Sequence, residues 1–173
     1  MVPAQLIDHR PPVIELRTRV GGWEGDLIIG RSSRSAIGTL VCRRTRYMKL
    51  IHLAGGHTAE ELLVGIRRTM GHLPALARMT LTWDQGSEMT SHDEKAGLFS
   101  EGVFFAHAGK PWQRGTNENT NGLARQYFPK GADLSALTSD DLLRVEDRLN
   151  NRPRKTLNWQ TPAAALTVGI AFM

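Results

Sequence analysis

The sequence predicts an α/β fold in which a mixed central sheet of about five strands is flanked by helices. Three short apolar runs come first, an amphipathic helix follows, and strand-like runs then alternate with helices. Many α/β domains share this order, so the pattern alone leaves the topology open. The chain has 173 residues, of which 40% are hydrophobic, and we therefore expect one globular domain with its own core.

The predicted strands are short apolar runs bounded by glycines or basic turns. They lie at residues 25–30, 36–42, 48–54, 79–83 and 102–106. Residues 1–22 contain three prolines, and we predict an extended lead-in or linker there rather than a packed element. The catalytic or binding domain is accordingly expected at residues 23–173.

The predicted helices follow from apolar residues at helical spacing. Residues 58–73 place Leu62, Ile66 and Met70 on one face, with Thr58 as N-cap and Glu61 completing a capping box. Further helices are expected at residues 92–99, 116–127 and 139–150, the last ended by the following proline.

Charge and cysteine content narrow the class of protein. The net charge is +5, and residues 10–49 hold nine basic and three acidic side chains. Such an excess favours a polyanionic partner, nucleic acid first, against an equally weighted alternative of a solvated basic surface. The single cysteine, Cys42, excludes an intramolecular disulfide framework, and no apolar run has membrane-spanning length. We expect a soluble cytoplasmic protein without a membrane partner or a small-molecule substrate.

Two aspartates stand beside buried strands. Asp26 opens the apolar run DLII, and Asp84 follows LTW at the turn DQG. A charged group there is costly unless it is solvated, paired or bound to metal. For each aspartate alone, a turn residue or a frayed strand start remains the more economical interpretation.

Glu118 lies in a more unusual setting. In a helix over residues 116–127, Glu118, Asn121, Gly122 and Arg125 share one side, while Leu123, Ala124 and Tyr127 share the other. Gly122 costs the helix roughly 1 kcal/mol relative to alanine. That cost is tolerable where a nucleic-acid strand must approach closely, the alternative being a solvent-facing polar side.

Asp26, Asp84 and Glu118 together would form a hard, oxygen-rich site. Mg²⁺ and Mn²⁺ prefer such ligands and keep positions for phosphate oxygens. Two ions roughly 4 Å apart serve phosphoryl transfer in this way. We therefore expect these three residues to be both the catalytic and the metal-binding residues, with two Mg²⁺ or Mn²⁺ ions per site.

Four stretches resemble the catalytic domain of DDE transposases of the insertion sequence 30 type. They are WEGDLIIG, LTWDQGSE, PWQRGTNENTNGLARQYFPKG with DLS just after it, and LNNRPRKTLNWQTPAAAL, spread over nearly the whole chain. The resemblance implies a ribonuclease H-like fold, the integrase core, and carries an acidic triad onto Asp26, Asp84 and Glu118. Thirty-three residues lie between Asp84 and Glu118, the spacing expected of that triad.

The resemblance also implies the activity. Such a domain cleaves at transposon ends, freeing a 3′-hydroxyl, and then joins that hydroxyl to target DNA. Transposases of this type carry an N-terminal helix-turn-helix region that reads the ends, and nothing before Gly22 fits one, so we expect the catalytic part alone. Self-association in the active complex and a place at the bacterial nucleoid follow from the same resemblance.

Residues around Glu118 and in the later basic loop are the predicted DNA contacts. Trp112 would stack on an unpaired base and Arg114 would bind phosphate, although a loop anchor in the core is the more economical role for Trp112. The other candidates are Asn121, Arg125, Lys130, Arg152, Arg154 and Lys155. Local ion pairs and a solvated helix terminus are the alternatives for these basic residues.

Two other functions remain open from the sequence. The same metal chemistry would serve a nuclease that hydrolyses DNA without strand transfer. A non-catalytic DNA-binding or oligomerisation module, left over from a transposase, is the second alternative, and metal-dependent activity would separate it from the enzymes.

Overall fold

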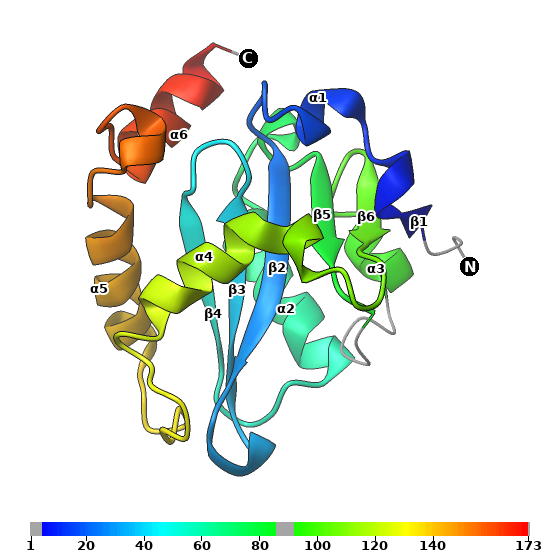
Figure 1. Cartoon of the computed structure of the whole chain (residues 1–173). Coiled ribbons are helices and arrows are strands. Elements are labelled where there is room, and N and C mark those ends of the chain that lie inside the picture. The colour runs from blue at the N-terminus through cyan, green and yellow to red at the C-terminus, as the bar shows by residue number, and fades with distance from the viewer. Residues whose placement is uncertain (1–4, 86–91, 173) are drawn as a thin grey trace.

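The structure, a computed structural model, describes residues 5–85 and 92–172. Its centre is a six-stranded mixed sheet in the order β1-β6-β5-β2-β3-β4 (Figure 1). The strands are β1 (Gln5–Leu6), β2 (Gly22–Ile29), β3 (Ala36–Cys42), β4 (Met48–Leu53), β5 (Thr80–Trp83) and β6 (Gly102–Phe105). β2, β3 and β4 are antiparallel neighbours, whereas β1, β6, β5 and β2 run parallel. The predicted α/β class and mixed sheet are confirmed.

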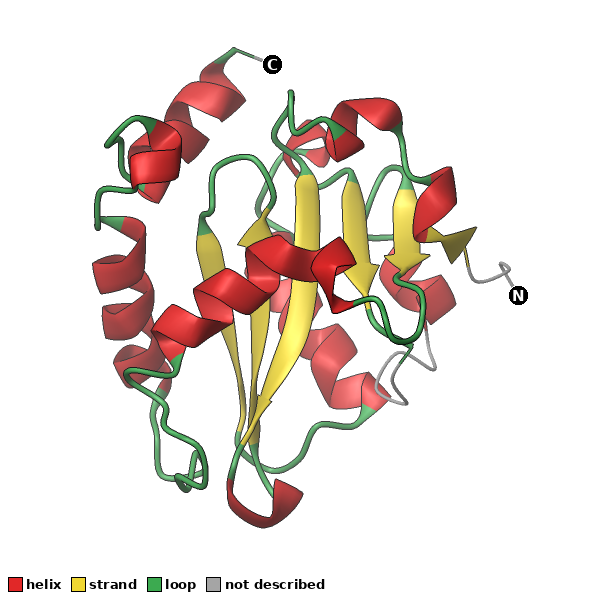
Figure 2. Ribbon diagram, viewed as in Figure 1, coloured by secondary structure: helices red, strands yellow, loops and turns green. Residues whose placement is uncertain are grey.

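Helices cover both faces of this sheet (Figure 2). α4 crosses one face in front of β2 and β3, α2 lies behind the sheet, and α5 lies beside β4. The α-helices are α1 (Pro12–Glu15), α2 (Ala59–Met70), α3 (His92–Ala96), α4 (Gly115–Ala124), α5 (Ser139–Asn150) and α6 (Pro162–Ala171). Short 3-10 turns are η1 (Ile7–His9), η2 (Arg31–Ser33), η3 (Ala75–Ala77), η5 (Pro111–Arg114) and η6 (Lys155–Leu157).

Alternation along the strands divides the core into two layers. On β3, Ala36, Leu40 and Cys42 join the cluster that includes Leu62 and Ile66 of α2. Residues of opposite parity, such as Ile37 and Val41, join the cluster under α4 and α5. Cys42 is buried in the first of these clusters.

The described part of the predicted lead-in is packed, contrary to expectation. β1 pairs in parallel with β6, and Ile14 of α1 is 1% exposed. Pro12 occupies the first turn of α1, where its missing N–H costs nothing, so the proline starts a helix instead of extending the chain. Spaced apolar residues in this segment then cover the sheet, which a proline count does not reveal.

The predicted helices are present. The Thr58–Glu61 capping box of α2 forms as expected, and α5 has the predicted bounds. α6 was not predicted because its small residues give no apolar stripe; Thr161 caps its first turn and Leu166 is buried. Within residues 5–85 and 92–172, no helix is long and apolar enough to cross a membrane.

Candidate functional site

Asp26 lies inside β2, not at its start as the sequence suggested. The strand extends back to Gly22 because residues 22–24 pair in parallel with β5. Alternation places Glu24 and Asp26 on the face that α4 covers, while Gly25 faces the ring of Trp83. The Asp26 side chain is 30% exposed. Its Oδ1 accepts from the Leu27 amide at 2.9 Å, which fixes the orientation of the carboxylate.

Asp84 directly follows β5, as predicted, and its side chain is 44% exposed. Glu24 on β2 pairs with Thr82 on β5, and two residues further along each parallel strand come Asp26 and Asp84. The register therefore brings the two aspartates to neighbouring positions. Gly86 of the predicted turn lies outside the described residues.

Arg114 joins the two aspartates. Its Nη2 donates to Asp84 Oδ2 at 3.2 Å, and its Nη1 lies 3.7 Å from Asp26 Oδ1. The same Nη1 donates to the Gly25 carbonyl at 3.1 Å, which ties η5 to β2. One cation thus reaches both carboxylates, so the pair is close enough to share a positively charged partner.

Polar contacts fasten α4 over this pair. The side-chain Nδ2 of Asn121 donates to Asp26 Oδ2 at 3.1 Å, and the backbone N–H of Asn117 donates to Glu24 Oε2 at 2.9 Å. Thr39 on β3 donates toward Asn117 Oδ1 and toward the Asp26 carbonyl, both at 3.3 Å. The helix is therefore positioned by hydrogen bonds to β2 and β3 rather than by apolar packing alone.

This arrangement corrects the predicted faces of α4. Ala124 is buried, but Tyr127, expected on the packed side, is 38% exposed. The buried residues of the helix are mostly small and polar (Thr116, Asn117 and Thr120), because polar groups of β2 and β3 lie beneath it. A Cβ added to Gly122 would meet nothing within 4 Å, so the helix surface there is open.

Glu118 is exposed in the first turn of α4. It precedes Asn121 by three residues, so both project from the same side of the helix. In the described part of the chain, no three His, Cys, Asp or Glu side chains lie close enough together to hold a metal ion. The structure therefore brings Asp26 and Asp84 together and leaves Glu118 near them without completing a three-carboxylate cluster.

The carboxylate pair nevertheless fits a hard divalent cation. Asp26 and Asp84 are solvent-accessible, they offer anionic oxygens, and a single guanidinium already reaches both. Oxygen ligands of this kind suit Mg²⁺ and Mn²⁺. Glu118 lies on the accessible side of the helix that contacts Asp26, and it is the predicted third ligand.

The sequence analysis missed Glu24 as a functional residue. Its side chain is 0% exposed and forms an ion pair with Arg43, itself 5% exposed. Arg43 also donates to the Ile14 carbonyl. A charged residue at the position before Gly25-Asp26, inside a buried strand, was the available signal. Its role as an anchor for α4 depends on Asn117, 93 residues away, which no local pattern reveals.

The predicted DNA contacts divide into two groups. The first group lies on η5, on α4 or in the segment that follows α4, and consists of Trp112, Arg114, Asn121, Arg125 and Lys130. Trp112 is 69% exposed, so the alternative of a core anchor is wrong. The other group (Arg152, Arg154 and Lys155) lies between α5 and α6, at the β4 end of the sheet.

Exposure separates these basic residues further. Lys130, Arg152 and Lys155 are exposed. Arg154 is partly buried and donates to the Leu149 carbonyl at 3.0 Å. Burial, followed by the charge of Arg152, lowers the pKa of Arg154. Arg154 is therefore held by a hydrogen bond to the backbone, whereas the structure shows no such side-chain bond to a described residue for Lys130, Arg152 or Lys155.

Comparisons with known proteins identify relatives for nearly the whole chain. The transposase for insertion sequence element IS1086 of Cupriavidus metallidurans is 46% identical over 171 residues, covering 98% of this chain and 50% of the relative. Transposase InsI for insertion sequence element IS30A of Escherichia coli is 42% identical over 166 residues, covering 96% and 43% respectively. The chain thus spans about half the length of these curated relatives. No protein-family model matches it.

Solved structures agree on the fold. The catalytic core domain of BIV integrase has a TM-score of 0.64 at 15% identity, covering 87% of this chain and 96% of that one. A chain of the simian T-cell lymphotropic virus intasome in complex with PP2A regulatory subunit B56 gamma also has a TM-score of 0.64, at 19% identity, covering 96% and 59%. The chain has the ribonuclease H-like fold of integrase catalytic cores. By its sequence identity to the two relatives named above, it belongs to the family of insertion sequence 30-type transposases, and it spans about half the length of those relatives.

Proposed function

We propose that this chain is the catalytic part of a DNA transposase, a DDE polynucleotidyl transferase that cleaves at transposon ends and joins the 3′-hydroxyl to target DNA. The observation that carries the proposal is the pairing of Asp26 and Asp84 through Arg114 beneath the helix of Glu118. Two accessible carboxylates on neighbouring parallel strands, next to a basic residue, suit phosphate chemistry. The family relationship supports the same reaction type.

In this proposal Asp26, Asp84 and Glu118 hold two Mg²⁺ or Mn²⁺ ions. When bound, the ions supply charge neutralisation at the scissile phosphate and activation of the attacking oxygen. The Leu27 amide and Asn121 keep the Asp26 carboxylate in a fixed orientation. Glu118 approaches the pair from α4, whose first turn is anchored by Glu24.

Arg114 has two successive partners in this account. Without DNA, its guanidinium bridges the aspartates; when DNA arrives, it exchanges them for a phosphate group. Arginine suits both roles because its planar fork pairs with carboxylates and phosphates alike. This exchange frees the carboxylates of Asp26 and Asp84 to bind metal ions when the negatively charged substrate arrives.

The DNA path follows the exposed side of η5 and α4. Gly122 leaves the helix surface open for a strand, and Arg125 and Lys130 continue the basic surface beyond it. Arg152, Arg154 and Lys155 form a separate basic loop, which we assign to flanking DNA. Because two ends must meet one target, the active complex contains more than one copy, acting at the bacterial nucleoid.

A labelled duplex with a free 3′-hydroxyl, incubated with this chain, supercoiled plasmid and Mn²⁺, tests the function. Joining of the label to the plasmid supports a transferase. A 3′-dideoxy end should prevent joining and leave plasmid nicking intact. Nicking without joining from either end supports the nuclease, and DNA binding without any product supports the non-catalytic module.

A further inference from the structure

A cavity of about 430 Å³ lies between the N-terminal segment and η5. Three arginines (Arg10, Arg17 and Arg43) and two acidic residues (Asp8 and Glu15) line it, together with Ile7 and with Trp112 and Gln113 of η5. None of the candidate catalytic carboxylates is among its lining residues. Its volume lies within the range of small-ligand sites.

The basic side chains that line this cavity outnumber the acidic ones by three to two. Arg10 forms an ion pair with Glu15, and Arg43 forms one with the buried Glu24. Arg17 is exposed and forms no ion pair with any described residue. One guanidinium at the cavity is therefore left to meet an anion from outside the chain.

The pKa values of two arginines in this region, Arg10 and Arg46, are lowered. Burial, and then the charge of Arg43, lowers the pKa of Arg10. Burial, and then the charge of Arg17, lowers the pKa of Arg46. Burial is the largest cause of both shifts, and a phosphate bound in the cavity would favour the charged form of Arg10.

Trp112 adds an aromatic surface to this basic cavity. Its side chain is 69% exposed, although burial would remove a large apolar area from water. A basic groove beside an exposed aromatic ring is the combination that binds unpaired nucleotides, because every base has a face that can stack. A base-paired duplex does not present such faces.

Covalent and hydrogen-bonded links connect the cavity to the carboxylates. Trp112 is two residues before Arg114, which reaches Asp26 and Asp84. On the cavity floor, Arg10 donates to Thr82 Oγ1 at 3.0 Å, and Thr82 is two residues before Asp84. Two strand residues span roughly 7 Å, so a strand held in the cavity lies beside the carboxylates.

We propose that this cavity is a nucleotide subsite for an unpaired DNA strand, whose base stacks on Trp112 and whose phosphate binds Arg17. The subsite rests on the proposed function for its choice of DNA as ligand. It adds the place where one unpaired nucleotide is held next to the cleavage site. The cavity itself, with Arg17 as the phosphate contact beside the stacking ring, is the new element.

Binding of fluorescein-labelled oligo(dT), and of a duplex of equal length, tests the subsite in EDTA. Trp112→Ala should weaken oligo(dT) binding about tenfold, as expected for one lost stacking contact, and change duplex binding less than twofold. Trp159 is also 69% exposed and lies outside the cavity, so Trp159→Ala is the matched control and should change neither affinity. Equal effects of the two tryptophan variants, or equal losses for both DNA forms, would overturn the proposal.

Two further probes separate stacking from charge. An abasic strand keeps the phosphates and should bind the unchanged protein about as weakly as oligo(dT) binds Trp112→Ala. Arg17→Gln should weaken oligo(dT) binding more than duplex binding and reduce the slope of log affinity for oligo(dT) against log salt by about 0.7, whereas Arg144→Gln on α5 should not. Full binding of the abasic strand, or an unchanged slope in Arg17→Gln, contradicts the subsite.

Failure of the nucleotide subsite can be distinguished from failure of the proposed transposase function. Metal-dependent nicking without a Trp112-dependent preference for oligo(dT) would remove the subsite and keep the enzyme. A Trp112-dependent preference without any nicking would keep the subsite and remove the proposed function. Absence of oligo(dT) binding by the unchanged protein would remove the subsite outright.

Discussion

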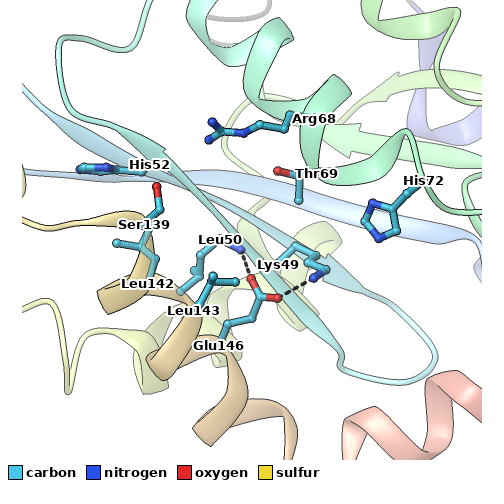
Figure 3. Close-up of a pocket in the computed structure, with 10 residues that line it drawn as sticks. All are labelled: Lys49, Leu50, His52, Arg68, Thr69, His72, Ser139, Leu142, Leu143 and Glu146. Carbon is cyan, nitrogen blue, oxygen red and sulfur yellow. Dashed lines mark hydrogen bonds and ion pairs between the residues drawn. The ribbon is translucent and has the colours of Figure 1, made fainter.

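Two buried glutamates of this protein use the same chemistry in different regions. Glu24 on β2 accepts a hydrogen bond from the backbone N–H of Asn117 and forms an ion pair with Arg43. Glu146 on α5 accepts from the Leu50 amide at 3.0 Å and from Lys49 Nζ at 2.6 Å (Figure 3). Each carboxylate therefore fastens a helix to the sheet through one backbone amide and one cation.

The two anchors differ in what they hold. Glu24 holds α4, which carries Glu118 and Asn121, whereas Glu146 holds α5 against the edge strand β4. Asn150 extends the second anchor by bonding both the amide and the carbonyl of Met48 at 2.8 Å. Covering the exposed groups of an edge strand prevents pairing with another chain.

Their surroundings differ as well. The side chains of Glu24 and Arg43 are 0% and 5% exposed, but that of Lys49 is 18% exposed. Burial opposes the charge of Lys49, yet its hydrogen bond to Glu146 raises the pKa of this lysine. We therefore expect the Glu24 pair to affect activity through α4, and the Glu146 pair to affect stability alone.

The largest effect is expected from the carboxylates themselves. Asp26→Asn and Asp84→Asn should each lower activity by about 10³-fold or more, because losing a metal ligand removes several kcal/mol of transition-state stabilisation. Thermal unfolding should be little changed, since neither residue belongs to the core. Activity near that of the unchanged protein in either variant would remove that residue from the site.

Glu24→Gln and Glu146→Gln test the comparison directly. Glu24→Gln leaves Arg43 buried beside an amide and should destabilise the fold by about 3 kcal/mol, with activity of the folded protein reduced about 10- to 100-fold. Glu146→Gln should cost about 1 kcal/mol, because Lys49 is partly solvated, and leave activity within about twofold. Chemical denaturation and turnover of fully folded samples measure both quantities. Equal losses of activity in the two variants would refute the distinction.

Removing Arg114 tests whether its guanidinium competes with metal ions for Asp26 and Asp84. Arg114→Gln should increase the affinity for Mn²⁺ by about fivefold, or roughly 1 kcal/mol, because a competing cation is removed from an exposed pair. The same variant should bind DNA more weakly. Calorimetric titration with Mn²⁺ measures the first effect, with Arg144→Gln as control. A lower affinity would mean that Arg114 orders the carboxylates instead of competing with metal.

The smallest effect is expected from Arg125, at the C-terminal end of α4. Arg125→Ala should weaken DNA binding similarly for different sequences and reduce the slope of log affinity against log salt by about 0.9. Arg148 lies in the last turn of α5, and Arg148→Ala should leave that slope unchanged. Titrations at several salt concentrations decide the matter, and an unchanged slope in Arg125→Ala would exclude a phosphate contact.

The sequence predicts what local patterns determine. The bounds of β3 and α5, the Thr58 cap and the position of Asp84 after a strand all follow from short-range periodicity and turn chemistry. Asp26 is misplaced within its strand because the residues before it pair with β3 on one side and with β5, far along the chain, on the other.

Long-range contacts account for the remaining differences. The packing of Ile14, the Arg114 bridge and the Glu24 anchor all join residues that no periodic pattern connects. Trp112 is instructive in the opposite sense, because an aromatic residue in a proline-containing segment favours a buried anchor, yet the structure leaves it exposed at the cavity.

The central claim is that Glu118 completes a metal-dependent site with Asp26 and Asp84. Nicking of supercoiled plasmid in Mn²⁺, Mg²⁺ or EDTA tests it most directly, with Glu118→Gln beside Glu60→Gln, an exposed glutamate in the first turn of α2 on the other face of the sheet. The account predicts nicking that requires metal, persists in Glu60→Gln and disappears in Glu118→Gln. Metal-dependent nicking that persists in Glu118→Gln would contradict it.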